Sequence, residues 1–143
     1  MIAVDTNILL YAHRAELPWN SAASELLKKL SEGAERWAIP WPCIHEFLGV
    51  ATNPRAFKPP TPLPAALRQV ELWMASPSLR LLGEAAGYWE RLQELVQAGH
   101  LAGSVIHDAH VAALCLQHGV EELWSADRDF SRMRGLRVRN PLL

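Results

Sequence analysis

The sequence predicts an α/β sandwich with a mostly parallel sheet of about five strands. Short apolar segments that resemble strands alternate with longer segments of helical periodicity along the 143-residue chain. Such alternation is typical of sheets whose parallel strands are joined by helices. An Asp also follows the first and the fourth of these strand-like segments. Because ligands bind at the carboxyl ends of strands in such sheets, we expect the functional site at that edge.

The first quarter of the chain is expected to form one strand and two helices. Residues 2–5 predict a buried strand, and a helical stretch follows to about His13. After a break, Asn20 or Ser21 is suited to cap a second helix, which is expected to end at Gly33.

The middle of the chain predicts a strand, a helix, a stiff loop and another helix. Residues 36–40 are strand-like, and Pro42 suits the first turn of the helix that follows. The segment 55–64 contains four prolines and is expected to be a loop, followed by a helix over 65–75. The remaining expected elements are a strand at 78–82, a helix at 85–97, a helix at 104–118, a strand at 122–125 and a strand at 136–138.

Composition limits the class of protein. Half of the residues are apolar and a fifth are charged, which is typical of a globular protein, and the length suits one domain over 1–143. No apolar run is long enough to span a bilayer, and Asp5 interrupts any signal-like start. Cys43 and Cys115 lie in apolar helical patterns and form no cluster. We therefore expect a cytoplasmic protein with buried thiols and no membrane partner.

Charge is unevenly distributed. The net charge of −1 argues against a protein that holds nucleic acid by positive charge alone. Five arginines nevertheless gather in residues 128–139, where they are expected either to contact RNA phosphates or to be solvated. The six tryptophans are expected mainly to pack in the core or in a dimer, with Trp19 and Trp41 the best candidates for exposure.

Two helical segments carry an acid beside their apolar face. A helix turns by about 100° per residue, so Glu46 lies roughly 60° from the apolar arc that contains Phe47. Asp108 lies at a similar angle from the arc that contains Ala109. Both acids should therefore point along the sheet edge, whereas His107 and His110 are expected to face solvent.

Four acids are thus expected at one edge: Asp5, Glu46, Asp108 and Asp127. Carboxylates at close range raise each other's pKa unless a countercharge is present. A hard divalent cation bound by oxygen, Mg²⁺ or Mn²⁺, would supply it, and such an ion can activate water against a phosphodiester. An alternative is that each acid meets an Arg or a backbone N–H.

The blocks that hold these acids carry a resemblance. They are VDTN at residues 4–7, HEFL at 45–48, HDAHVAAL at 107–114 and SADRDF at 125–130. In this order and spacing the chain resembles the PIN-domain ribonucleases, and among them the VapC-type toxins of toxin–antitoxin pairs. The segments TNPRAF at 52–57 and GLRVRNPL at 135–142 resemble one VapC-type subgroup.

The resemblance implies a three-layer α/β/α fold and a Mg²⁺- or Mn²⁺-dependent endoribonuclease. Asp5, Glu46, Asp108 and Asp127 would take the acidic positions, with Asp5 and Asp108 the most direct metal ligands. The supporting residues would be Thr6 and Asn7, which form hydrogen bonds, Ser125, which stands where the family often has Thr, and Asp129, a second-rank acid. The resemblance also implies an RNA substrate, a small antitoxin that plugs the pocket, and a homodimer.

Two other functions fit parts of the sequence. A haloacid-dehalogenase-type phosphatase also places an Asp after its first strand, but it needs a second Asp where this chain has Asn7. A non-catalytic binding module on the same fold is the third possibility, although all four acids are present.

Overall fold

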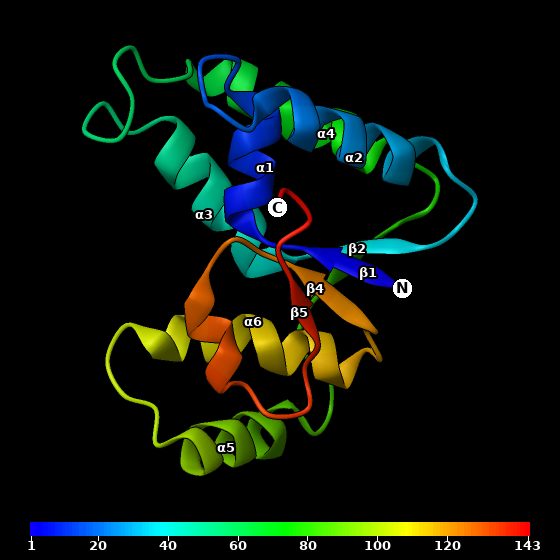
Figure 1. Ribbon diagram of the computed structural model, residues 1–143, viewed down its shortest axis with the longest axis vertical. Coiled ribbons are helices and arrows are strands. Elements are labelled where there is room, and N and C mark those ends of the chain that lie inside the picture. The colour runs from blue at the N-terminus through cyan, green and yellow to red at the C-terminus, as the bar shows by residue number, and fades with distance from the viewer.

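The computed structural model describes residues 1–143 and contains a five-stranded parallel sheet (Figure 1). The strands are β1 (Ile2–Val4), β2 (Trp37–Pro40), β3 (Leu79–Leu82), β4 (Glu122–Trp124) and β5 (Val138–Arg139). Their order is β3-β2-β1-β4-β5, and every neighbouring pair is parallel. The predicted sheet is therefore confirmed.

Six α-helices cover the two faces of the sheet. They are α1 (Thr6–His13), α2 (Asn20–Glu32), α3 (Trp41–Ala51), α4 (Leu63–Met74), α5 (Tyr88–Gly99) and α6 (Val105–Gln117). In Figure 1, α1, α2 and α4 lie above the sheet and α5 and α6 lie below it, which confirms the three-layer arrangement. A short 3₁₀ helix, η1 (Arg128–Arg132), was not predicted. None of the helices combines the length and apolar character that a bilayer-crossing segment needs.

The central strands explain why distant parts of the sequence meet. β1 lies between β2 and β4, and Val4 stands opposite Trp124 in the sheet. The chain therefore leaves both strands at the same edge, where the backbone N–H of Asp5 donates to the carbonyl of Trp124 at 3.0 Å. The strand residues behind this edge, such as Val4 and Leu123, are fully buried in the core. Burial fixes which way each strand faces and so aims the residues that follow it.

One predicted helix cap is wrong. The N-cap position of α2 is Trp19, and it makes no side-chain capping hydrogen bond. Asn20 instead donates through Nδ2 to the carbonyls of Tyr11 (2.8 Å) and Ala12 (3.1 Å) at the end of α1. Carbonyls in the last turn of a helix lack helical partners, so the amide of Asn20 satisfies them and ties the two helices together.

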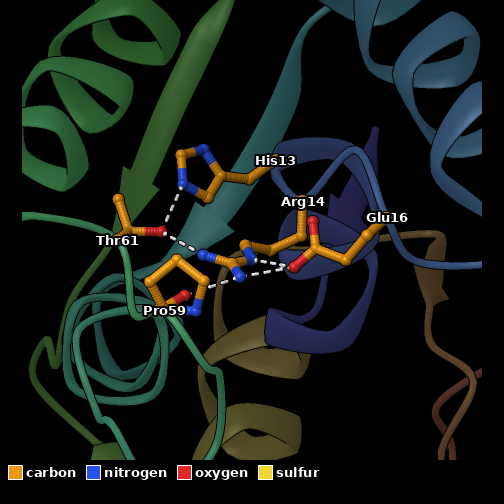
Figure 2. A network of polar contacts seen from close by, with 5 residues as sticks. All are labelled: His13, Arg14, Glu16, Pro59 and Thr61. Carbon is orange, nitrogen blue, oxygen red and sulfur yellow. Dashed lines mark hydrogen bonds and ion pairs between the residues drawn. The ribbon is translucent and has the colours of Figure 1, made fainter.

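The proline-rich loop between α3 and α4 is fastened to the end of α1 by Arg14 (Figure 2). The Arg14 guanidinium donates to Thr61 Oγ1 at 3.1 Å and to the Pro59 carbonyl at 2.9 Å, and it forms an ion pair with Glu16. It also lies 4.4 Å from the ring centroid of Phe57. Only 12% of the Arg14 side chain is exposed, so these contacts are partly shielded from water.

Removing this guanidinium should loosen the loop. Arg14→Met keeps the aliphatic stem but leaves the Pro59 carbonyl without its donor. It also leaves Thr61 Oγ1 with His13 Nε2, at 3.1 Å, as its one side-chain partner, so the free energy of unfolding should fall by about 1–2 kcal/mol. Urea unfolding followed by circular dichroism measures this. Arg55→Met is the matched control, because Arg55 is an exposed arginine of the same loop. Equal losses of unfolding free energy in the two variants would contradict the role of Arg14 in fastening the loop.

Candidate active site

The four acids predicted to converge line one cavity of about 200 Å³ at the carboxyl edge of the sheet. Asp5 follows β1, Glu46 lies on α3, Asp108 lies in the first turn of α6 and Asp127 follows β4. We call this the acidic cavity. Its remaining lining residues are Thr6, Asn7, Leu10, Pro42, His107, His110 and Val111.

Asp5 is the most buried of these acids, with an exposed fraction of 7%. Its carboxylate caps α1 by accepting the N–H of Thr6 at 2.8 Å, and it accepts the Ser125 hydroxyl at 2.7 Å. Burial raises the pKa of Asp5 above its ordinary value, although the hydrogen bonds from Ser125 and Thr6 act in the opposite direction. The carboxylate is therefore held in one orientation at some electrostatic cost.

Asn7 and Ser125 join the ends of β1 and β4. Asn7 Nδ2 donates to Asp5 Oδ2 and to Ser125 Oγ, each at 3.1 Å, while its Oδ1 accepts the N–H of Ala126 at 3.0 Å. Ser125 Oγ in turn accepts the N–H of Asp127 at 3.0 Å. The structure thus places Thr6, Asn7 and Ser125 around Asp5 as hydrogen-bond partners.

The thiol of Cys43 is a partner of Asp5 that the sequence did not suggest. It lies 3.5 Å from Asp5 Oδ1 and is buried. The sequence did contain a sign of this contact. Cys43 lies on the apolar arc of α3, and Glu46 lies at the border of that arc.

The closest group of carboxylates is Asp108, Asp127 and Asp129, with one oxygen of each within 4.8 Å of the other two. Asp127 accepts the N–H of Asp129 at 2.8 Å and caps η1, and this turn brings Asp129 into the group. Asp5 shares the cavity with Asp108 and Asp127 but lies outside this closest group.

These carboxylates repel one another. The pKa of Asp108 is raised from 3.8 to about 6, first by partial burial and then by the negative charges of Asp127, Asp5, Asp129 and Glu46. Burial and neighbouring negative charge therefore both disfavour the ionised form of Asp108.

A divalent cation fits this set of donors. None of the five acids forms an ion pair with an Arg, a Lys or a His, so neutralisation by arginine does not hold. The other half of the alternative holds for two acids, because Asp5 accepts the backbone N–H of Thr6 and Asp127 accepts that of Asp129. The closest group offers only carboxylate oxygens, which suit Mg²⁺ or Mn²⁺ better than zinc.

The prediction that the histidines of α6 face solvent is wrong for His110. This residue is half-buried, its Nε2 lies 2.6 Å from Glu84 Oε1, and its ring packs edge-on against Tyr88. His107 is exposed, yet both histidines line the acidic cavity. The reason is that the first turns of α6 form the mouth of the cavity, so residues on either side of Asp108 reach it.

The tryptophans divide evenly between core and surface. Trp37, Trp73 and Trp124 are buried, whereas Trp19 and Trp41 are exposed as predicted. Trp89 is the most exposed, at 62%, which was not predicted.

The arginine-rich end is only partly solvated. Arg137 and Arg139 pair with Glu122, and Arg132 donates to the carbonyls of Gly99 and His100. The two remaining arginines, Arg128 and Arg134, are exposed and make no ion pair or side-chain hydrogen bond.

Comparison with known sequences finds similarity over nearly the whole chain. The family model for the PIN domain matches residues 2–136. Ribonuclease VapC43 of Mycobacterium tuberculosis is 37% identical over 142 residues, which cover 99% of this chain and 96% of the relative. Ribonuclease VapC48 of the same species is 30% identical over 137 residues, which cover 96% and 94%.

Solved structures share the fold. The crystal structure of VapBC2 from Rickettsia felis, bound to a promoter DNA fragment, contains a chain with a TM-score of 0.67 at 20% identity, covering 97% of this chain and 98% of that one. The VapC20 toxin of M. tuberculosis, described as cleaving the sarcin–ricin loop, also has a TM-score of 0.67, at 19% identity, covering 92% and 93%.

Proposed function

The chain belongs to the PIN-domain family, and within it to the VapC ribonucleases, and on this basis we propose that it is a Mg²⁺- or Mn²⁺-dependent endoribonuclease. We propose further that it is the toxin of a type II toxin–antitoxin pair. The observation that carries the proposal is the group of acids at the carboxyl edge that no basic residue neutralises.

Each acid has a distinct proposed role. Asp108 and Asp127 would hold the cation, with Asp129 beside them. Asp5 is fixed by its hydrogen bonds from Thr6 and Ser125 and completes the negative wall. A divalent cation bound there would make water a better nucleophile and would offset the charge of the scissile phosphate. Glu46 lies on the exposed side of the cavity and accepts no hydrogen bond from the protein, so it is free to take a proton from water.

The same assignment suggests partners. A small antitoxin that covers the acidic cavity is supported by the VapBC complex among the structural neighbours. A homodimer is also proposed, and the large apolar side chains that are left exposed are the candidates for its interface. They are Trp19, Trp41, Leu63, Leu67, Leu72, Met74, Trp89 and Leu143. We place the protein in the cytoplasm, in keeping with its two free thiols.

Metal-dependent RNA cleavage is the direct test. Purified protein should cleave single-stranded RNA in Mg²⁺ or Mn²⁺, and EDTA should reduce the rate to background, with activity returning when the cation is restored. Gel analysis of labelled RNA measures this. Hydrolysis of small phosphate monoesters without RNA cleavage would instead indicate a phosphatase, and RNA binding without cleavage would indicate a binding module. Either result would contradict the proposal.

A further inference from the structure

A second cavity, of about 530 Å³, adjoins the acidic cavity and shares Asp127 with it. It lies between η1 and the ends of β4 and β5, and we call it the side cavity. Its lining residues are Ser125, Ala126, Asp127, Arg128, Phe130, Ser131, Leu136, Val138 and Asn140. The volume lies within the range of small-ligand sites in proteins. A molecule that occupies both cavities would therefore lie against Asp127.

The lining of the side cavity combines apolar walls with unused hydrogen-bonding groups. Leu136 and Val138 are half-buried and supply apolar surface. Asn140 uses its Oδ1 to accept the N–H of Leu142 at 3.0 Å, which leaves its amide nitrogen without a partner in the protein. The hydroxyl of Ser131 also has no protein partner. An apolar slot with free polar groups at its edge suits an unpaired nucleobase, which offers a flat face and a polar rim.

One arginine that lines the side cavity has no acidic partner in the protein. Arg128 lines the side cavity and makes no ion pair, whereas Arg132, Arg137 and Arg139 are all occupied by protein groups. The acidic residues that line the two cavities, Asp5, Glu46, Asp108 and Asp127, repel phosphate. Arg128 is therefore the group best placed to attract a phosphate of a strand that runs through the acidic cavity.

We propose that the side cavity binds the nucleotide of single-stranded RNA that adjoins the scissile phosphate. The base lies between Leu136 and Val138 with its polar edge toward Asn140 and Ser131, and Arg128 contacts the phosphate. This inference rests on the proposed ribonuclease function and adds a determinant of which sequence is cut.

Arginine variants test the phosphate contact. Arg128→Gln should lower kcat/KM for RNA cleavage about 5–10-fold, mainly through KM, and should make the logarithmic salt dependence shallower by about 0.7. Arg134→Gln is the matched control, because Arg134 is an equally unpaired arginine of the same segment outside the side cavity, and its kcat/KM should stay within about twofold. Equal effects of the two substitutions, or no effect of either, would overturn the proposal.

Asn140→Asp tests the base contact. The substitution keeps the Oδ1 that accepts from Leu142 and replaces the amide donor by an acceptor, so the protein should melt normally. Cleavage of a randomised RNA, read by sequencing, should show a changed base preference at one position beside the cut. An unchanged preference would overturn this part of the proposal.

The ribonuclease activity and the role of the side cavity can be tested separately. If the wild-type protein cleaves no RNA, the ribonuclease assignment fails. Fluorescence anisotropy of labelled RNA with the two arginine variants then still decides whether the side cavity binds RNA. If the wild type cleaves RNA and both arginine variants behave alike, only the assignment of the side cavity fails.

Discussion

Asp5→Asn should lower ribonuclease activity about a thousandfold or more while the protein remains folded. The substitution changes one atom but removes a negative charge from the wall of the acidic cavity. It also replaces one of the two carboxylate oxygens by an amide N–H₂, so the Oδ1 that accepts the N–H of Thr6 or the Oδ2 that accepts the hydroxyl of Ser125 is lost as an acceptor. Because the cation and the reacting phosphate both depend on this charge, the effect should fall mainly on kcat.

The control separates chemistry from folding. Glu121→Gln removes an exposed carboxylate at the opposite end of β4, where it pairs with the N-terminal amine, and should leave cleavage unchanged. Circular dichroism should show the same secondary structure in both variants. Native-like activity in Asp5→Asn would exclude the proposed mechanism, whereas loss of structure would make Asp5 a folding residue.

The placement of Asp5 and Asp127 was predictable because it depends on local pattern and one topological rule. Each follows a short apolar strand, and parallel strands joined by helices end at one edge. The strand order was not predictable, since the pairing of β1 with β4 joins residues about 120 positions apart and leaves no periodic signal. The cap by Asn20 escaped prediction for a related reason, because its acceptors belong to another helix.

The candidate site shows the same division. Helical spacing placed Glu46 and Asp108 on the cavity side of their helices, as the structure shows. Asp129 was expected only as a second-rank acid, but the unpredicted turn of η1 brings its carboxylate beside Asp127. A five-residue 3₁₀ helix is too short to produce a periodic pattern, and the side cavity beside it depends on the same turn.

Asp108→Asn should stabilise the protein in the absence of divalent metal and abolish cleavage. Partial burial and four neighbouring carboxylates raise the pKa of Asp108 to about 6, so ionising this side chain at neutral pH costs folding free energy. An unscreened shift of this size would correspond to about 3 kcal/mol, which solvent screening at a partly exposed group reduces to about 1 kcal/mol. Removing the charge should therefore raise the melting temperature by a few degrees at pH 7.5 in EDTA.

The sign of the pH dependence follows from the raised pKa. In the unfolded chain Asp108 ionises near its ordinary value of 3.8, and in the folded protein near 6. The contribution of Asp108 to stability is therefore complete below pH 3.8 and is lost as the pH rises through about 6. The melting temperature of Asp108→Asn should match that of the wild type near pH 4 and exceed it increasingly up to about pH 7. Burial raises the pKa of Asp5 as well, so its contribution to the pH dependence has the same sign in both proteins.

A divalent cation should reverse this order. Mn²⁺ binds the ionised carboxylates, so it should raise the melting temperature of the wild type more at pH 7.5 than at pH 5, where protons compete for the same oxygens. Asp108→Asn should respond weakly at both pH values, because a neutral amide replaces one carboxylate of the closest group. A metal-free Asp108→Asn that melts below the wild type at pH 7.5 would show that Asp108 stabilises the fold through contacts of its own. An equal response of both proteins to Mn²⁺ would show that the cation binds elsewhere. Repulsion among the carboxylates lowers the stability of the metal-free protein, and the same negative charge attracts the cation. Asp108→Asn should therefore show both a higher metal-free melting temperature and a weaker response to Mn²⁺.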